Sequence, residues 1–509
     1  VVIIGATIHN SGSILADAGT AALLSGSEVL YAPGGDTPFL IKAPVEGGNG
    51  AAIENGGVIR AAEAVLKSAG SAYAIAVNGG GEISATSIDQ SGGRILIEGD
   101  GDITIDAGTT LRASAIGSGD GGSVVIKSGA ATTFEGRIEA KGGAEGGDGG
   151  FAEVSGASVT FAGDVDLAAA AGDTGTFLID PVSVDIDAPT AASIVTNLDT
   201  ANFEVQADND ITVNAPIVNE TTTNTLTLNA PTVVVNEDIT MPAGRLVFDS
   251  SADTAVSVTS DASAAISVDS LGLGSHQYNT FAGPLLVGNS VSFDPLTSTV
   301  ESFSATNAAN EINNLYLTDG AVTVTGDVDV RSSTTMSVAF SLNVTGDLTL
   351  ASGGDLLFEN DTPGTFNVDG LTRLAATGSV TNLGNDLILG GAGRKLIYHS
   401  DAGGTNIGAG YTEVIGVAFP NDPLGAGNAI YIDDGSVLPL LTITADSKSK
   451  MYGDPEPSLT ASFTGGSASD LTSLVQFRFD VPHTDVGVYT ITPYGASSAT
   501  HQLEYMSGT

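Results

Sequence analysis

An internal repeat of about 28 residues constrains the fold of this chain more than any other feature, because a period in this range is typical of a solenoid. Gly-Gly pairs begin at Gly92, Gly121 and Gly149, so their spacing is nearly constant. Each interval holds about three short runs of alternating apolar and polar residues, such as Ile95–Glu98 and Ile103–Asp106. Alternation puts successive side chains on opposite faces of a strand, and glycines between the runs allow tight corners with positive φ. Three strands and three corners per repeat predict one coil of a right-handed parallel β-helix.

The composition suits such a solenoid. The chain has 509 residues, and 67 of them are Gly, which is about twice the usual share of roughly 7%. A solenoid can reach this length because each coil packs only on its neighbours. Apolar residues make up 42% of the chain, which is enough to form a core. We expect about 18–22 coils over residues 1–439, each advancing about 4.8 Å.

The charge balance excludes several kinds of partner. The chain carries 59 acidic and 16 basic residues, for a net charge of −43. Such a surface repels nucleic acid and anionic lipid and attracts cations. There is no Cys, so disulfides, thiolate catalysis and cysteine metal sites are excluded. The sequence has no run of about 18 apolar residues that would predict a transmembrane helix.

A second repeat precedes the Gly-Gly repeats. The segment Ile8–Ala16 matches Ile53–Ala61, and Val77–Ala85 is a looser third copy with one extra residue before Ile83. Each copy has Asn at a glycine-containing turn, so we expect these Asn side chains to stack between coils. Tyr31–Gly50, rich in Pro and Gly, interrupts the pattern and is predicted to be a side excursion.

From Ala188 to about Pro439 the repeats loosen. A cleaner unit returns at Val324–Val330 and Val344–Leu350, whose glycines are closer together in sequence than successive Gly-Gly pairs are. We therefore predict a β-helix over residues 1–187 with coils of about 28 residues, continued over 188–439 by shorter, looser coils. The side chains predicted to stack inside the coils are Ile95, Ile97, Val124, Ile126, Val154, Val159, Phe161, Val328, Val330, Leu348 and Leu350.

The carboxy-terminal part of the chain changes character. Leu441–Phe463 and Asp485–Gly495 combine a strand, a Lys-x-Tyr-Gly-Asp-x-x-Pro turn and a later Val-Gly-x-Tyr-x-Ile strand. This pattern resembles the MBG domain, a small all-β module found in tandem on bacterial surface proteins, and predicts such a domain over residues 440–509. The residues that carry the resemblance are Lys450, Tyr452, Gly453, Asp454, Pro457, Val486, Gly487, Tyr489 and Ile491.

The solenoid part also resembles a known family. The amino-terminal repeats, Gly172–Pro181, His276–Phe293 and Gly393–Asp401 are similar to segments of filamentous-haemagglutinin-like exoproteins of two-partner secretion. The resemblance implies a structural adhesin fragment at the outer surface of a Gram-negative-type bacterium, exported by an outer-membrane two-partner transporter. Its host, cell-surface or polysaccharide receptor stays open, and so does self-association into a filament or sheath. We expect both ends to continue in a longer protein.

Paired carboxylates leave an enzyme as a lesser alternative. Asp164 with Asp166, and Asp327 with Asp329, are i and i+2 pairs on one strand face, about 7 Å apart. That separation lies within the window of about 6.5–9.5 Å for inverting glycosidases, so a polysaccharide-active β-helix enzyme is conceivable. Against it, we expect these residues to face water without basic or aromatic neighbours. We therefore predict no enzymatic activity and no catalytic residues.

Other candidate sites are weaker. Gly99–Asp106 loosely resembles a calcium-binding turn, but no full motif repeats, so we expect no cofactor and only weak, diffuse Ca²⁺ binding by the acidic surface. No strand–helix unit follows the glycine strings Gly117–Gly122 and Gly142–Gly150, so they predict corners and no phosphate cradle. The histidines show no metal-ligand spacing and are predicted to be solvated or to lie at edges; they are His9, His276, His399, His483 and His501.

Overall fold

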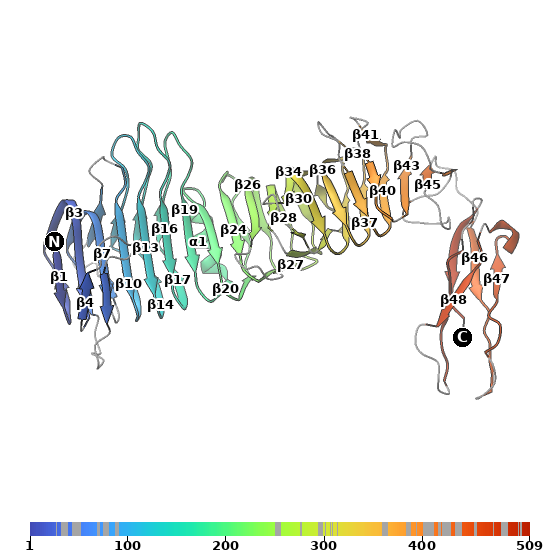
Figure 1. Ribbon diagram of the computed structural model, residues 1–509, viewed down its shortest axis with the longest axis horizontal. Coiled ribbons are helices and arrows are strands. Elements are labelled where there is room, and N and C mark those ends of the chain that lie inside the picture. The colour runs from blue at the N-terminus through green and yellow to red at the C-terminus, as the bar shows by residue number, and fades with distance from the viewer. Residues whose placement is uncertain are drawn as a thin grey trace. The chain divides into compact units, whose positions relative to one another are not determined.

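The predicted strands form parallel ladders, in which each strand pairs with its counterpart one coil further along the chain (Figure 1). The computed structural model forms two units, Val1–Ser298 (unit 1) and Thr299–Thr509 (unit 2). The residues that it describes are 1–26, 28–31, 39–42, 52–68, 72–74, 81–86, 91–249, 256–274, 277–293, 299–300, 302–305, 307, 309–312, 314–358, 365–382, 388–392, 394–400, 412–415, 419, 429–432, 440–451, 456–471, 473–479, 487–496, 498 and 501–508.

Three ladders build the first part of unit 1. Ladder 1 runs through β1 (Val2–Gly5), β3 (Ser13–Ser25), β7 (Val58–Ser68), β10 (Arg94–Gly99), β13 (Ser123–Ser128), β16 (Phe151–Ser155) and β19 (Thr176–Asp180). Ladder 2 runs through β2 (Ile8–Asn10), β6 (Ile53–Asn55), β8 (Ala72–Ala74), β11 (Ile103–Ile105), β14 (Ala131–Phe134) and β17 (Ser158–Phe161). Ladder 3 begins in the first halves of β3 and β7 and continues through β9 (Glu82–Ala85), β12 (Thr110–Arg112), β15 (Arg137–Glu139) and β18 (Asp164–Asp166).

The pairing register reproduces the sequence repeat. Arg94 pairs with Ser123 and Ser123 with Phe151, so each pairing advances along the chain by one Gly-Gly repeat. The strands in between belong to the other ladders, so one repeat makes one turn through all three. The prediction of a nearly all-β chain with long parallel sheets is confirmed, and the arrangement is compatible with a parallel β-helix.

The amino-terminal repeats also stack as predicted. Ile8 pairs with Ile53, and the Asn10 amide Nδ2 donates to Asn55 Oδ1 at 2.7 Å, so the expected asparagine contact between coils is confirmed. Val77–Gly80 of the third copy lie outside the described residues. Within the predicted side excursion, β5 (Phe39–Lys42) pairs antiparallel with β4 (Glu28–Tyr31), and the remaining excursion residues are not described.

Inward side chains stack in register to form the core. Ile97 pairs with Ile126 and Ile126 with Val154, and each is at most 1% exposed. The prediction is equally confirmed for Ile95, Val124, Val328, Val330, Leu348 and Leu350. It is only partly correct for Val159 and Phe161, which are half-buried because β17 is the last strand of ladder 2.

One helix, which the sequence reading did not predict, ends ladder 3. Helix α1 (Ala188–Asn197) begins after Asp187, whose carboxylate accepts the Thr190 amide at 3.1 Å. So short a helix is marginal on its own in water, so packing must hold α1, and Ala191 and Ile194 are buried. The side chain of Asn197 accepts the Val165 amide of β18 at 2.6 Å and so caps the last strand of the ladder.

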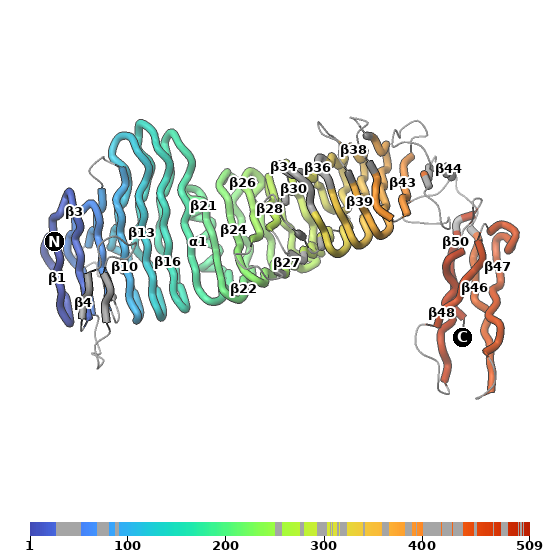
Figure 2. Tube along the Cα trace, viewed as in Figure 1, coloured from blue at the N-terminus to red at the C-terminus, as the bar shows by residue number. Residues whose placement is uncertain are grey.

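After α1 the coils of unit 1 become smaller (Figure 2). Phe203 pairs with Leu226, and Leu226 pairs with Leu246, so the interval between paired positions shortens from one coil to the next. The strand just before α1 is β20 (Ser183–Ile186), and the strands after it are β21 (Asn202–Gln206), β22 (Asp210–Val213), β23 (Ile217–Val218), β24 (Thr225–Asn229), β25 (Thr232–Val235), β26 (Ile239–Asp249), β27 (Val256–Ser260), β28 (Ile266–Leu273), β29 (Gln277–Phe281) and β30 (Leu285–Phe293).

Unit 2 contains further parallel ladders. The two predicted short repeats pair with each other, Val328 with Leu348. The strands are β31 (Thr299–Val300), β32 (Ser302–Ala305), β33 (Glu311–Ile312), β34 (Asn314–Val324), β35 (Val328–Ser332), β36 (Met336–Val344), β37 (Leu348–Ser352), β38 (Leu356–Phe358), β39 (Thr365–Val368), β40 (Thr372–Ala376), β41 (Val380–Asn382), β42 (Ile388–Gly390), β43 (Lys395–His399), β44 (Thr412–Ile415) and β45 (Ala429–Ile432).

The carboxy-terminal residues change from parallel ladders to mixed sheets. One sheet has the order β47 (Ala461–Thr464), β46 (Leu440–Ala445), β50 (Gln502–Met506), and another pairs β48 (Gln476–Phe479) with β49 (Ile491–Tyr494). The short 3-10 helix η1 (Ala468–Asp470) follows β47. Ile491 begins β49, whereas the predicted motif residues Tyr452, Gly453, Asp454 and Val486 lie outside the described residues.

Candidate functional site

The Gly-Gly pairs lie where successive coils touch backbone to backbone. A Cβ on Gly149 would lie 1.8 Å from the Leu167 carbonyl oxygen, and one on Gly122 would lie 1.9 Å from that of Gly93. Glycine is therefore required by close approach of the backbone, and the predicted reason, positive φ, is wrong for these pairs. Positive φ occurs instead in the loops before them, at Gly117, Gly119, Gly146 and Gly147.

Those loops project from the coils between ladder 3 and ladder 1. We call residues 114–120, 141–148 and 168–173 the projecting loops. They hydrogen-bond to one another, for example from the Gly119 amide to the Gly146 carbonyl at 2.9 Å. The glycine strings examined for phosphate binding lie here and lead into strands β13 and β16, without a helix that could orient amides toward a phosphate.

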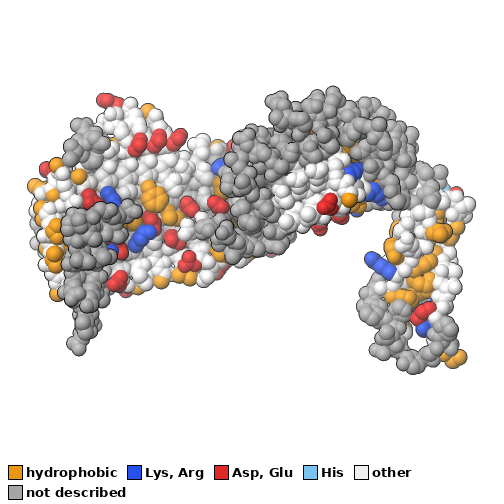
Figure 3. All heavy atoms as spheres, in the orientation of Figure 1, with side chains coloured by type: hydrophobic (Ala, Val, Ile, Leu, Met, Phe, Trp, Pro, Cys, Tyr) orange, Lys and Arg blue, Asp and Glu red, His pale blue; other side chains and the backbone are white. Residues whose placement is uncertain are grey.

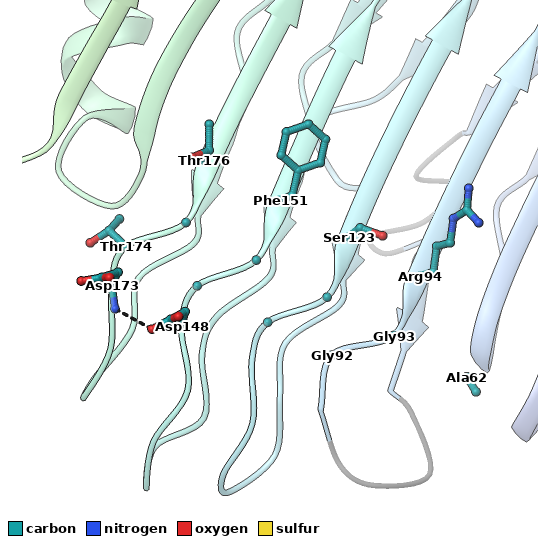
Figure 4. A pocket seen from close by; sticks show the side chains of 15 residues that line it. Ala62, Gly92, Gly93, Arg94, Ser123, Asp148, Phe151, Asp173, Thr174 and Thr176 are labelled. Carbon is teal, nitrogen blue, oxygen red and sulfur yellow. Dashed lines mark hydrogen bonds between the residues drawn. The ribbon is translucent and has the colours of Figure 1, made fainter. Parts of the chain in front are cut away.

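A groove runs along the inner side of these loops, across the first residues of four ladder 1 strands (Figure 4). Its volume is about 740 Å³. Glycines of the Gly-Gly pairs form its floor, so few side chains fill it. The side chains along its edges are Ala62, Arg94, Ser123, Asp148, Phe151, Asp173, Thr174 and Thr176.

Aspartates on the loop side of the groove join the coils. The Asp148 amide donates to Asp120 Oδ1 at 2.9 Å, and the Asp173 amide donates to Asp148 Oδ1 at 2.9 Å (Figure 4). Each carboxylate therefore satisfies the amide of the equivalent residue in the neighbouring coil. This contact holds Asp148 in place while leaving its carboxylate further acceptor capacity, since a carboxylate offers about four acceptor positions.

The backbone of the groove floor is already hydrogen-bonded. The first glycine of a pair donates to the following coil, as from Gly121 to the Asp148 carbonyl at 2.8 Å. The second donates within its own coil, as from Gly122 to the Ala113 carbonyl at 2.7 Å. The equivalent amides of Gly92, Gly93, Gly149 and Gly150 are also paired. The floor glycines therefore offer no free amide to a ligand, so hydrogen-bond donors in the groove must come from side chains.

Three of the four aspartates weighed as an enzyme site make structural contacts, and the fourth, Asp164, is exposed. Asp327 Oδ1 accepts the Asp347 amide at 2.8 Å, and Asp329 receives two hydrogen bonds of 3.1 Å from the Arg331 guanidinium. Asp166 pairs with Lys141, and Arg137 Nη2 lies 3.6 Å from its Oδ2. The expectation that these residues lack basic neighbours is therefore wrong for Asp166 and Asp329.

Opposite charges from neighbouring coils pair on the outer face of ladder 1. Lys67 Nζ lies 2.8 Å from Glu98 Oε2, and Lys127 Nζ lies 2.8 Å from Glu153 Oε1. Such cross-strand pairs favour the observed register. Red acidic side chains outnumber blue basic ones on the face drawn in Figure 3, in agreement with the net charge.

The described residues contain no group of three or more His, Asp or Glu side chains arranged to hold a metal ion. Asp102 of the calcium-like turn instead accepts the Ala131 amide at 3.1 Å. His399 is buried at the end of β43, so it is not solvated, whereas His9 is exposed and pairs with Glu54. His276 and His483 lie outside the described residues, and His501 is half-buried.

The sequence reading missed the groove because the Gly-Gly pairs were interpreted as corners only. A usable signal was present at Asp148–Phe151, where an aromatic residue directly follows Asp-Gly-Gly. Ser123 and Thr176 occupy the equivalent positions in the neighbouring coils. Arg94 occupies the same position one coil before Ser123, so an aromatic residue stands here where the neighbouring coils have polar ones, which indicates a surface role.

Comparison with known proteins identifies only the last part of the chain. No curated protein and no solved structure matches the chain. In the part of the chain that the structure describes, no helix has the length and apolar character needed to span a membrane. Residues 441–509 match the family MBG domain (YGX type). These residues therefore form an MBG domain, a module found in large surface and adhesin-type proteins, which suggests an extracellular or surface protein.

Proposed function

We propose that the chain is part of a secreted or cell-surface structural adhesin. In this proposal the parallel ladders form a right-handed β-helix, which acts as a stiff extracellular rod and presents binding surface away from the cell. The MBG domain at residues 441–509, following the parallel-strand part, is the observation that carries the proposal. The sequence resemblance to filamentous-haemagglutinin-like exoproteins adds export by a two-partner transporter to the outer surface of a Gram-negative-type bacterium.

The proposed role is mechanical and involves no catalysis. Three of the four aspartates that would be candidates for acid–base chemistry accept a backbone amide or pair with a basic residue; they are Asp166, Asp327 and Asp329. The receptor would be uncharged or cationic, because the net charge of −43 repels polyanions. Calcium would bind weakly and diffusely to the acidic surface.

The experiment is to locate the protein on its own cells and to measure its adhesion. Immunogold labelling of intact cells should place gold particles on the outer surface, and deletion of the cognate transporter should abolish this labelling. Labelled purified chain should bind target cells saturably, with excess unlabelled chain as competitor. Labelling confined to permeabilised cells would contradict the proposal, as would binding that does not saturate.

Self-assembly into a filament or sheath is a second candidate. Exposed apolar side chains in the carboxy-terminal part favour it, since Leu474 is 87% exposed and Val488 is 85% exposed. Exposed apolar surface of this kind favours contact with another chain. Analytical ultracentrifugation and negative-stain imaging of the purified chain should reveal concentration-dependent polymers if this candidate holds, and a monomer at all concentrations would reject it.

A further inference from the structure

The groove beside the projecting loops has the features of a ligand site that runs across the coils. It crosses the starts of β10, β13, β16 and β19, so at about 4.8 Å per coil it extends roughly 14 Å. The glycine floor leaves it open along this length. A site of this form suits an extended chain more than a compact small molecule.

Among the described residues that line the groove, Phe151 is the only aromatic one, and its side chain is exposed. It is 37% exposed, although its ring is large and apolar. Its neighbours in register are Ser123 and Thr176, whose side chains are too small to cover the ring (Figure 4). An exposed ring beside carboxylates and hydroxyls provides an apolar platform with polar groups around it, which is typical of ligand sites.

The hydrogen-bonding groups that the groove offers suit a sugar chain better than a peptide. A peptide added as a strand would need unpaired backbone groups, but the amides of the floor glycines already donate to other carbonyls. The remaining acceptors and donors include the Asp148 and Asp173 carboxylates and the Thr176 hydroxyl. These groups suit the many hydroxyls of a carbohydrate, and the ring suits its C–H face.

Charge narrows the class of carbohydrate. Asp148 and Asp173 lie on one side of the groove, and Arg94 is the only basic residue among the described ones that line it. The whole chain adds a net charge of −43. A sulfated or uronic-acid polymer would be repelled, whereas an uncharged polymer would not.

We propose that this groove binds an uncharged polysaccharide chain lying across the coils, with a sugar ring stacked on Phe151. The inference deepens the proposed adhesin function and rests on it for its biological meaning. Asp148 and Asp173 would accept hydrogen bonds from sugar hydroxyls. The Asp148 contact with the Asp173 amide fixes the carboxylate before ligand arrives, which reduces the ordering cost of binding.

The test is calorimetric titration of the full chain with neutral tetrasaccharides, namely cellotetraose, maltotetraose, mannotetraose and the tetramer of N-acetylglucosamine. A heparin tetrasaccharide serves as the polyanionic comparison. We expect saturable binding of at least one neutral probe and weaker or no binding of heparin. Phe151→Ala should weaken the neutral interaction about tenfold or more through loss of the stacking platform.

Val182→Ala is the matched control, because Val182 is 39% exposed and does not line the groove. Its affinity should equal that of the parent, and thermal melts should show both variants folded. The proposal is overturned if no neutral probe binds, if heparin binds more tightly, or if both variants bind alike. Cell binding by the parent chain tests the adhesin proposal separately: a chain that binds cells but no neutral glycan overturns the groove proposal alone.

Discussion

At the scale of single residues, the Gly-Gly pairs must be glycine because the backbones of neighbouring coils leave no room for a Cβ. Gly149→Ala would place a Cβ 1.8 Å from the Leu167 carbonyl oxygen and 2.4 Å from the Gly175 amide nitrogen. Neither backbone atom can move without distorting a ladder, so we expect a loss of about 1–3 kcal/mol or more in the free energy of unfolding. Differential scanning calorimetry measures the effect as a lower melting temperature.

Gly19→Ala is the control for this substitution. A Cβ at Gly19 meets nothing within 4 Å, and the residue lies in a strand with no positive φ. It should leave the melting temperature unchanged or raise it slightly, because alanine lowers the entropy of the unfolded chain. Equal melting of both variants would show that backbone approach does not select glycine at the pairs.

Asp180 provides a test that depends on pH. Burial, followed by the charges of Asp208 and Glu153, raises the pKa of its carboxyl above the ordinary 3.8. A raised folded-state pKa means that ionisation costs stability, which is lost as the pH rises through that pKa. Asp180→Asn should therefore raise the melting temperature by about 1–2 °C at pH 7.

The rise in melting temperature of Asp180→Asn should vanish below about pH 3.8, where Asp180 is protonated in both the folded and the unfolded chain. Glu145→Gln removes one charge at an exposed position and controls for net charge. Melting curves of all three proteins from pH 3 to pH 8 measure the difference. A gain for Asp180→Asn that is independent of pH, or no larger than that of Glu145→Gln, would refute this account.

At the scale of elements, α1 fastens the end of ladder 3. Asn197 is 1% exposed; its Oδ1 accepts the Val165 amide at 2.6 Å, and its Nδ2 donates to the Ser193 carbonyl at 2.8 Å. Asn197→Ala would leave the buried Val165 amide unpaired and open a small void. We expect a cost of about 2–4 kcal/mol, concentrated in β18.

Native-state hydrogen exchange followed by mass spectrometry should detect this loss. Peptides covering Asp164–Asp166 should exchange faster in Asn197→Ala, with little change in β10 two coils or more away. Thr196→Ala is the control, since Thr196 is exposed and its hydroxyl donates within its own helix, to the Ala192 carbonyl. Unchanged protection of β18 in Asn197→Ala would mean that α1 does not cap the ladder.

At the scale of the whole molecule, charge sets the response to salt. A net charge of −43 makes the folded chain repel itself, so moderate NaCl should raise the melting temperature by screening. Ca²⁺ should act at lower concentration because of its higher charge, and Mg²⁺ should match it if binding is diffuse. A Ca²⁺ effect that saturates and resists Mg²⁺ would instead indicate specific sites, and the absence of any salt effect would contradict the screening argument.

The repeats were predictable because strand alternation and glycine spacing are local patterns with a fixed period. The registers at Gly92, Gly121 and Gly149 and the stacking of Asn10 on Asn55 follow from them. Helix α1 was missed because so short a segment is stabilised by packing against strands far away in sequence. The groove was missed for a related reason: Phe151 acquires its neighbours only when three coils are stacked.

The Gly-Gly contact also limits how such a chain can change its length during evolution. The pairs at Gly92, Gly121 and Gly149 fit against the equivalent residues of the next coil, and the Asp120 and Asp148 carboxylates each accept the Asp amide of the next coil. The joints on the two sides of the coil that begins at Gly121 are therefore nearly the same. Duplicating or deleting one whole repeat restores every joint, whereas an insertion of a few residues at the joint breaks one. Gene rearrangements that keep this period would therefore change the length of the stacked coils in steps of one coil. Each step would also add or remove one strand start along the groove.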